Sequence, residues 1–295
     1  MSRTETDETR FKFGENWARF LNVLDDNRIE EAERSLREML GVERLEGQTF
    51  LDVGSGSGLF SLVAYRLGAK VHSFDYDSQS VATTSELRRR YCEKQAMWTV
   101  EEGSVLDNEY LSRLGKFDVV YSWGVLHHTG AMRQAMENVI PLVREGGTLF
   151  IAIYNDQEFI SRFWRKVKRL YCSGLAGRMM VIPTFFAFFA LAGLAGDILR
   201  TRNPLRRYTE YRSKRGMSIL HDWIDWLGGY PYETATPEDV FEFYRSRGFS
   251  LKKLKTRQSL GCNEFVFTHL DTGAPSAEDK WLRGQSLSNP QAHRQ

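Results

Sequence analysis

The chain has 295 residues, with 40 Lys and Arg against 38 Asp and Glu, and 42% of its residues are hydrophobic. This composition excludes a disordered or low-complexity chain, and the length fits one large domain or a core with an appendage. The net charge of +2 excludes the strongly basic balance of a protein that coats nucleic acid, so we do not expect a nucleic-acid partner.

Three cysteines, Cys92, Cys172 and Cys262, lie 80 and 90 residues apart. This spacing predicts neither a metal site nor a disulfide framework. The polar first ten residues do not have the pattern of a secretory signal, which combines a basic start with an apolar stretch. We therefore expect reduced thiols and a cytoplasmic location.

Between residues 48 and 153, short apolar runs of strand length alternate with amphipathic stretches of helix length. The predicted strands cover residues 49–53, 70–75, 97–101, 117–122 and 148–153, and the predicted helices cover 58–67, 80–94 and 131–142. The runs FDVVYS and TLFIAI are almost wholly apolar, as in strands that have helices on both faces. The pattern predicts an α/β fold with a parallel sheet.

Further segments flank this core, which we place at residues 46–156. Residues 1–45 are expected to contain one or two amphipathic helices at 16–40, and residues 157–235 to form a helical insertion or cap. A helix that begins with Thr236 as its N-cap, followed by strands at 250–256 and 263–269, completes the core at 236–270. We expect the two strands to pair at the sheet edge. Residues 271–295 are predicted to be a flexible tail.

A glycine-rich turn follows the first predicted strand in the sequence FLDVGSGSGLF. Glycines allow a tight turn and let a ligand approach the strand end and the following helix N-terminus. Asp75 ends the next strand 21 positions beyond Gly54, where a carboxylate can accept hydrogen bonds from ribose hydroxyls. The arrangement predicts a nucleoside cofactor, although a lone glycine turn can also be an ordinary strand-to-helix connection. A dinucleotide fingerprint would need Gly or Ala at position 59, and Leu59 weakens that alternative.

Five segments in order, FLDVGSGSG, HSFDYD, EEGSVLD, FDVVYSWGVLHH and LVREGGTLFIAIYND, resemble the motifs of class I S-adenosylmethionine-dependent methyltransferases. The resemblance covers residues 48–156 and extends to 236–270. It implies a Rossmann-like, doubly wound, mostly parallel sheet of seven strands, with an N-terminal helical lid and a helical insertion after the fifth strand. It also implies S-adenosyl-L-methionine as the cofactor and no catalytic metal. Similar domains include those of coenzyme Q-type methyltransferases.

The resemblance assigns cofactor-binding roles to residues of these motifs. Asp52 is expected near the methionine amino group, Asp75 and Tyr76 at the ribose, Trp123 at the methionine part or the sulfonium, and Trp17 in the lid. The remaining expected cofactor-binding residues are Gly54, Ser55, Gly56 and Gly58 in the turn and Ser104 and Val105 beside the adenine. Two alternatives remain: Trp123 could pack in the core, and the leading helix could serve stability alone.

Two departures from the family pattern narrow the assignment. Many relatives carry Asp after the glycine of the third-strand loop, whereas Ser104 stands here, so adenine contact through backbone groups is expected in part. The fourth strand is followed by Ser122-Trp123-Gly124 rather than by an Asn/Asp-Pro-Pro-Tyr signature. That difference counts against adenine N6 and protein amide methyltransferases.

Catalytic candidates follow the fourth and fifth strands. His127 or His128 could act as a base, because histidine titrates in the appropriate range, or the pair could cap and pack the next helix. Tyr154 with Asn155 and Asp156 leaves the fifth strand, where ligands of open α/β sheets bind, and the last two could instead cap a helix. Aromatic residues at 221–233 and Glu264 are weaker candidates for the wall of the acceptor pocket.

Residues 162–215 contain thirteen Lys or Arg against two acidic residues, and they surround the apolar run VIPTFFAFFALAGLAG. An apolar helix flanked by cations suits the surface of an anionic membrane, so residues 178–215 are a candidate for peripheral membrane contact. The alternatives are a cap helix buried against the core, a contact in a homodimer, and a true membrane span. Pro183 and Asp197 argue against the span.

We therefore predict methyl transfer to a small-molecule or lipid-like acceptor, with O- or C-methylation ahead of N- or S-methylation, because a large cap would close off a flat macromolecular substrate. The alternatives are an NAD-dependent oxidoreductase and a non-catalytic nucleoside-cofactor-binding protein that docks on a membrane or a partner.

Overall fold

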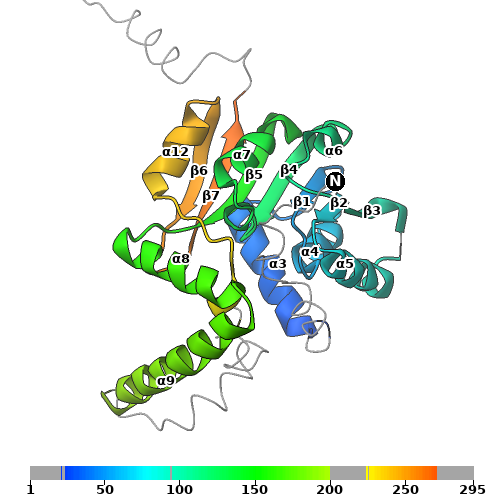
Figure 1. The fold of residues 1–295 in the computed structure, drawn as a ribbon. Helices are drawn as coiled ribbons and strands as arrows, with labels where there is room; N and C mark the ends of the chain where they lie inside the picture. Colours follow the sequence, from blue (N-terminus) through cyan, green and yellow to red (C-terminus); the bar gives the residue numbers. More distant parts are fainter. Residues whose placement is uncertain (1–20, 22–23, 94, 200–223, 225, 271–295) are drawn as a thin grey trace, which may run out of the picture.

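The computed structural model describes residues 21, 24–93, 95–199, 224 and 226–270 (Figure 1). The expectations for Trp17, for most of the N-terminal segment, for residues 200–223 and for the tail at 271–295 lie outside these residues.

A seven-stranded sheet forms the centre of the fold, in the order β3-β2-β1-β4-β5-β7-β6. Its strands are β1 (Thr49–Val53), β2 (Lys70–Asp75), β3 (Trp98–Glu102), β4 (Phe117–Trp123), β5 (Val143–Tyr154), β6 (Phe249–Lys255) and β7 (Cys262–His269). The first five strands pair in parallel, whereas β7 is antiparallel to both β5 and β6. This confirms the predicted mostly parallel, doubly wound α/β fold. The terminal hairpin lies at the edge as expected, with β7 inside and β6 outermost.

Helices cover both faces of the sheet (Figure 1). They are α3 (Asp26–Leu40), α4 (Leu59–Arg66), α5 (Ser78–Tyr91), α6 (Asn108–Ser112), α7 (Met132–Asn138), α8 (Phe159–Cys172), α9 (Leu175–Leu199) and α12 (Pro237–Arg245). Side chains of α3, α4 and α5 pack on one face, and side chains of α6, α7 and α12 pack on the other. The two apolar cores explain why strands such as β4 and β5 need apolar residues on both sides.

The part of the N-terminal segment that the structure describes packs on the core. The side chains of Ile29, Leu36 and Met39 on α3 are buried in the same apolar cluster as Leu62 and Val63 of α4. Within the described residues, α3 therefore acts as a supporting helix, which is the alternative to a lid.

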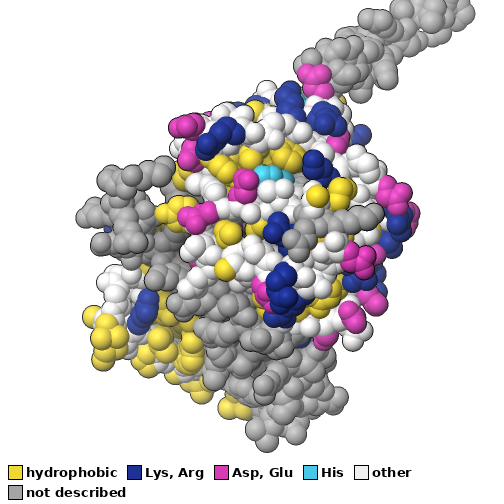
Figure 2. All heavy atoms as spheres, turned by 90° about the vertical axis from the view of Figure 1, so that its right-hand side faces the viewer, with side chains coloured by type: hydrophobic (Ala, Val, Ile, Leu, Met, Phe, Trp, Pro, Cys, Tyr) yellow, Lys and Arg dark blue, Asp and Glu magenta, His cyan; other side chains and the backbone are white. Residues whose placement is uncertain are grey.

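Helices α8 and α9 form the insertion between β5 and α12, and α9 extends away from the sheet (Figure 1). The chain leaves and re-enters the core at one place, because Asp156 N–H donates to the Ala235 carbonyl and Ala235 N–H donates to the Tyr154 carbonyl. Only 11% of the apolar segment Leu175–Ala195 is buried, so the expectation of a cap helix buried against the core is wrong for α9. Hydrophobic side chains gather at the lower end of the molecule in Figure 2, the level at which Figure 1 places α9.

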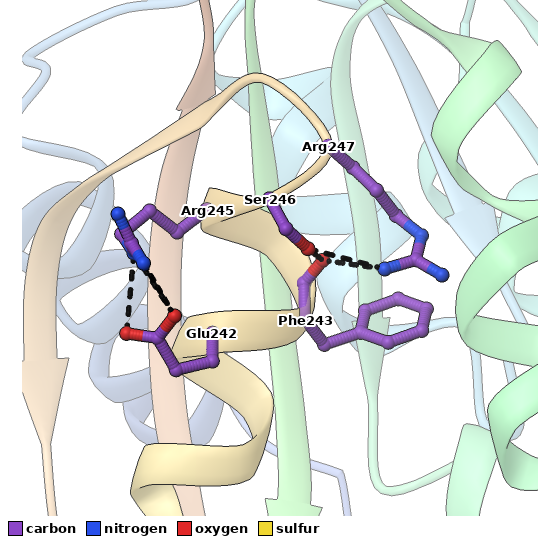
Figure 3. A network of polar contacts seen from close by, with 5 residues as sticks. All are labelled: Glu242, Phe243, Arg245, Ser246 and Arg247. Atoms are coloured by element: carbon purple, nitrogen blue, oxygen red, sulfur yellow. Dashed lines mark hydrogen bonds and ion pairs between the residues drawn. The ribbon is translucent and has the colours of Figure 1, made fainter.

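The ends of α12 are fixed by local polar contacts. At its start, Asp239 N–H donates to Thr236 Oγ1 over 3.1 Å and Thr236 N–H donates to the Asp239 carboxylate, which confirms the predicted N-cap. At its end, the Arg247 guanidinium donates to the Phe243 carbonyl over 3.0 Å and lies 3.8 Å from the centre of the Phe243 ring (Figure 3). Arg247 also forms an ion pair with Glu137 of α7 at 3.0 Å, which links the end of α12 to α7.

Candidate active site

A cavity of about 1160 Å³ opens at the carboxyl ends of β1, β2 and β4. The strand order reverses between β1 and β4, and such a switch point is where open α/β sheets bind ligands. The cavity runs from the glycine turn after β1 to Tyr154 at the end of β5 and Trp226 in the returning segment. One continuous space therefore joins the predicted cofactor site to the region expected to hold an acceptor.

The glycine turn needs glycine for two separate reasons. Gly54, Gly56 and Gly58 have φ values of 80°, 54° and 78°, which side-chain-bearing residues rarely adopt. A Cβ atom on Gly54 would lie 2.4 Å from Val125 Cγ1, which lines the same cavity. The turn therefore depends on glycine both for its backbone conformation and for its close contact with the loop after β4. Ser55, as expected, also lines the cavity.

Asp75 is held in place by the backbone around it. Its Oδ2 accepts a hydrogen bond from Gly56 N–H and its Oδ1 accepts one from Asp77 N–H, both over 2.9 Å. An ionised carboxylate only accepts hydrogen bonds, which is the property that a ligand hydroxyl requires of its partner. The carboxylate thus links the glycine turn to the end of β2 at the cavity wall.

Asp52 is buried, with 2% of its surface exposed, and it lies at the end of a directed chain of hydrogen bonds. Trp98 Nε1 can only donate, so Ser73 Oγ accepts from it over 2.8 Å and donates to Ser61 Oγ over 2.7 Å. Ser61 Oγ then donates to Asp52 Oδ2 over 2.5 Å. Burial raises the pKa of Asp52 to about 7, with the Ser61 hydrogen bond opposing and nearby Asp75 adding to this shift.

The predicted adenine side of the cavity is lined by Ser104, Val105 and neighbouring Leu106. Ser104 Oγ accepts a hydrogen bond from Leu106 N–H over 3.2 Å, which folds the loop after β3 back on itself. A Cβ atom on Gly103 would lie 2.3 Å from Tyr110 Cε1, so the Tyr110 ring packs directly on the backbone of this loop. The structure therefore brings this loop to the cavity as expected.

Two aromatic residues present exposed rings at the cavity. Tyr76 is 48% exposed and Trp123 is 45% exposed, and both line the space. The alternative in which Trp123 packs in the core is therefore wrong. The indole of Trp123 is therefore accessible to a ligand in the cavity. Because an aromatic face attracts a cation, this ring is suited to contact a sulfonium.

The two histidines occupy different environments. His128 lines the cavity, and its Nδ1 lies 2.6 Å from the Pro231 carbonyl oxygen. Since a carbonyl only accepts, the neutral ring carries its proton on Nδ1 and its lone pair on Nε2. His127 is fully buried and does not line the cavity; its Nδ1 accepts from Tyr154 N–H over 3.4 Å. Burial, with repulsion from His128 and Lys168, holds the pKa of His127 well below its usual range.

Tyr154 lies at the centre of an aromatic group at the far end of the cavity. Its ring centre is 4.2 Å from that of His127, 5.1 Å from that of Tyr232 and 6.1 Å from that of Trp226. Burial raises the pKa of the Tyr154 phenol above its usual range, so the hydroxyl stays protonated at neutral pH. This end of the cavity can therefore hold an apolar or aromatic group and offer it a hydroxyl.

Several weaker candidates have structural roles instead. Asn155 donates to the Arg257 carbonyl, Asp156 accepts from Glu158 N–H, and neither lines the cavity. Glu264 does not line it either, so that expectation is wrong. Among the residues that the structure describes, no three His, Cys, Asp or Glu side chains are grouped to hold a metal ion.

Sequence reasoning missed the wall formed by Leu260, Gly261 and Cys262. These residues reach the cavity because Tyr154 pairs with Cys262 in the β5–β7 register. The signal for them was the terminal hairpin: a strand placed antiparallel beside β5 must begin where β5 ends. Burial raises the pKa of the Cys262 thiol to about 12, so it is protonated at neutral pH.

Comparison with known proteins gives matches to methyltransferases. Residues 51–149 match the family described as methyltransferase domain. The chain is 31% identical to the ubiquinone biosynthesis O-methyltransferase of Parvibaculum lavamentivorans over 120 residues, which are 39% of this chain and 43% of that protein. It is 27% identical to the enzyme of the same name from Caulobacter vibrioides over 110 residues, 37% of this chain and 42% of that protein. The chain thus aligns with less than half the length of these relatives.

Solved structures give matches over more of the chain. Magnesium protoporphyrin IX methyltransferase from Synechocystis PCC 6803, with bound SAH, has a TM-score of 0.49 at 13% identity and covers 82% of this chain and 83% of that chain. The N-methyltransferase NodS from Bradyrhizobium japonicum, in complex with S-adenosyl-l-homocysteine, has a TM-score of 0.47 at 14% identity and covers 84% of this chain and 91% of that chain. Residues 51–149 therefore match a methyltransferase domain, and the five motifs and the seven-stranded sheet agree with a class I S-adenosylmethionine-dependent methyltransferase.

Proposed function

We propose that this protein transfers the methyl group of S-adenosylmethionine to an oxygen or carbon atom of a small-molecule or lipid-like acceptor. The observation that carries the proposal is the single cavity that links Asp75 and the glycine turn to His128, Tyr154 and Trp226. A methyltransferase needs its cofactor and its acceptor in one space, because the reaction depends on in-line alignment of the two reacting atoms.

The residues of the first half of the cavity fit the cofactor. The backbone of the glycine turn leaves no room for side chains, and the lone pairs of Asp75 suit ribose hydroxyls. The buried carboxyl of Asp52 suits the methionine ammonium, and the exposed Trp123 ring suits the positive sulfur. Ser104 and Val105 would border the adenine. When bound, S-adenosylmethionine supplies an electrophilic methyl group on a sulfonium.

His128 is the base that we assign to the acceptor. Its Nδ1–H donates to the Pro231 carbonyl, which fixes the ring orientation and places the lone pair of the neutral ring on Nε2. Proteins often hold a catalytic histidine in one tautomer by a hydrogen bond from one ring nitrogen to a backbone carbonyl. We no longer assign a base role to His127, because its buried ring does not reach the cavity. Tyr154 would orient the acceptor through its hydroxyl.

The acceptor half of the cavity favours an apolar or aromatic compound. Tyr154, Trp226 and Leu260 line it, and all three pack against the apolar cluster of the α8–α9 insertion. The relatives named as ubiquinone biosynthesis O-methyltransferases agree with O-methylation ahead of the other classes. A carbon acceptor remains the second choice.

Calorimetric titration of the purified protein with S-adenosylmethionine and with NAD tests the cofactor. We expect saturable binding of the first only, because Leu59 stands where a dinucleotide fingerprint requires Gly or Ala and itself lines the cavity. Binding of NAD alone would replace the proposal by an oxidoreductase. Transfer of a radiolabelled methyl group into the organic phase of a lipid extract then separates catalysis from mere cofactor binding, and the His128→Gln variant serves as the matched inactive control.

A further inference from the structure

Helix α9 exposes large apolar side chains that no described part of the chain covers. They are Leu175, Met179, Met180, Phe188, Leu191 and Leu194, and their exposed fractions range from 43% to 75%. Leu175–Ala195 is long and apolar enough to cross a membrane, and only 11% of it is buried. A soluble surface rarely keeps such a patch without a partner.

The distribution of these side chains around the helix distinguishes a bilayer from a protein partner. At about 100° per residue, the exposed positions cover more than half of the circumference of α9. A contact with a second copy of the chain would cover one side and leave the others in water. Lipid surrounds a helix on all sides that protein does not occupy, so the pattern favours a bilayer.

A row of cations lies beside this apolar surface. Arg162, Lys166 and Arg169 on α8 are exposed and are spaced three or four residues apart, so they share one side of the helix. Exposed Phe159, Phe163 and Leu170 lie on the neighbouring side. Apolar groups next to Lys and Arg are the combination that binds anionic headgroups, because the side chains enter the acyl region while the cations remain at the phosphates.

The course of the chain excludes a transmembrane crossing. Helix α9 has 25 residues and is about 37 Å long, enough for the hydrocarbon core. However, the chain must return to the same side, because Leu227 is buried beside Trp164 of α8. The returning residues 200–223 contain seven Lys or Arg, whose transfer through hydrocarbon is too costly. Both ends of α9 therefore stay on one side of the membrane.

We propose that the α8–α9 hairpin is a monotopic membrane anchor that embeds α9 in one leaflet of an anionic bilayer, with the cations of α8 at the headgroups. Tyr154, Trp226 and Leu260, which line the cavity, pack against the apolar cluster to which α8 and α9 contribute Trp164 and Val181. The anchor therefore sets the acceptor end of the cavity next to the lipid phase. Membrane docking is independent of methyl transfer, so it can be tested without knowing the acceptor.

Flotation of the full-length protein with vesicles tests the anchor. We expect it to float with vesicles of phosphatidylcholine and phosphatidylglycerol at 3:1, and to bind pure phosphatidylcholine more weakly. The double variant Phe188→Glu/Leu191→Glu should lower the partition coefficient at least about 30-fold, because two large apolar contacts are lost. Replacing Arg162, Lys166 and Arg169 by Gln should lower it about 100-fold on anionic vesicles, at about fivefold per cation, and remove most of its salt dependence.

Leu254→Glu is the matched control, because Leu254 is also an exposed apolar residue, 41% exposed, but lies on edge strand β6. It should float like the wild type. All variants should keep the wild-type thermal midpoint and the wild-type affinity for S-adenosylmethionine, which separates failure of the anchor from failure of the cofactor assignment. Wild-type protein that stays in the soluble fraction at low salt overturns the proposal. The proposal is also overturned if the protein does not bind vesicles and instead forms a dimer in the absence of lipid that Leu191→Glu dissociates. In that case α9 contacts a second copy of the chain.

Discussion

On the proposed contact between Asp52 and the methionine ammonium, the affinity for S-adenosylmethionine should depend on pH, and the variant Asp52→Asn should remove this dependence. The carboxyl is buried and its pKa is raised to about 7, chiefly by burial. Only the ionised form forms a charge-assisted hydrogen bond with the ligand ammonium. Binding at or below neutral pH therefore has to select the ionised fraction and displace a proton from this group.

The size of the effect follows from that fraction. With a pKa of about 7, roughly one tenth of Asp52 is ionised at pH 6 and roughly nine tenths at pH 8. The apparent Kd is the intrinsic Kd divided by the competent fraction, so it should fall about tenfold between pH 6 and pH 8. At pH 8, Asp52→Asn should weaken binding roughly 10- to 100-fold, the usual range for a hydrogen bond to a charged group.

Calorimetric titration at pH 6, 7 and 8 provides the assay, with the ratio of the variant Kd to the wild-type Kd as its readout. The ratio removes the titration of the ligand's own amino group, whose pKa lies near about 8. It should be about tenfold larger at pH 8 than at pH 6. Ser61→Ala is a control with a directional outcome: loss of its hydrogen bond to Asp52 should move the midpoint above pH 7. A ratio that does not change with pH would refute the contact between the Asp52 carboxylate and the ligand.

Three further outcomes are expected. Lys168 is buried, and burial lowers its pKa from 10.5 to about 7. Between pH 7 and pH 10.5 the unfolded chain binds a proton that the folded protein has lost, so the free energy of unfolding should rise with pH. Urea unfolding should show a gain of about 2 kcal/mol from pH 7 to pH 9 that Lys168→Met lacks. Gly54→Ala, whose Cβ would meet Val125, should lower stability by about 1–3 kcal/mol and weaken cofactor binding, measured by thermal unfolding and calorimetry; wild-type values in both would contradict the strain argument. His128→Gln should reduce turnover by about 10²- to 10⁴-fold while cofactor affinity stays within about threefold; unchanged turnover in a methyl-transfer assay would remove it as the base.

Much of the cofactor half could be predicted because its residues lie at the ends of consecutive elements. Gly54 follows β1 and Asp75 ends the neighbouring strand β2, so the pairing of the two strands brings these residues together. Ser104 follows β3 in the same way. Local turn chemistry and strand order were sufficient there.

The acceptor half depends on contacts over long sequence separations, which periodicity does not reveal. The orientation of His128 depends on Pro231, which lies 103 positions further along the chain and whose carbonyl accepts a hydrogen bond from Nδ1–H. The burial of α9 could not be predicted either, because a helix that is apolar all round is consistent with a core helix and with a lipid-exposed one. Only the position of α9 relative to the sheet distinguishes the two.

The two halves of the cavity are therefore built by different parts of the chain, and this separation has a chemical consequence. The cofactor half is formed by the turns after β1, β2 and β3, and at Gly54 the first of them has no room for a Cβ. The acceptor half is formed where the α8–α9 insertion and the β7 end meet Tyr154. Changes in the insertion can alter acceptor size or access to lipid without moving the Asp75 carboxylate, because Asp75 is held by the N–H groups of Gly56 and Asp77 at the ends of β1 and β2. Acceptor choice in this fold can therefore diverge while the cofactor chemistry stays constant.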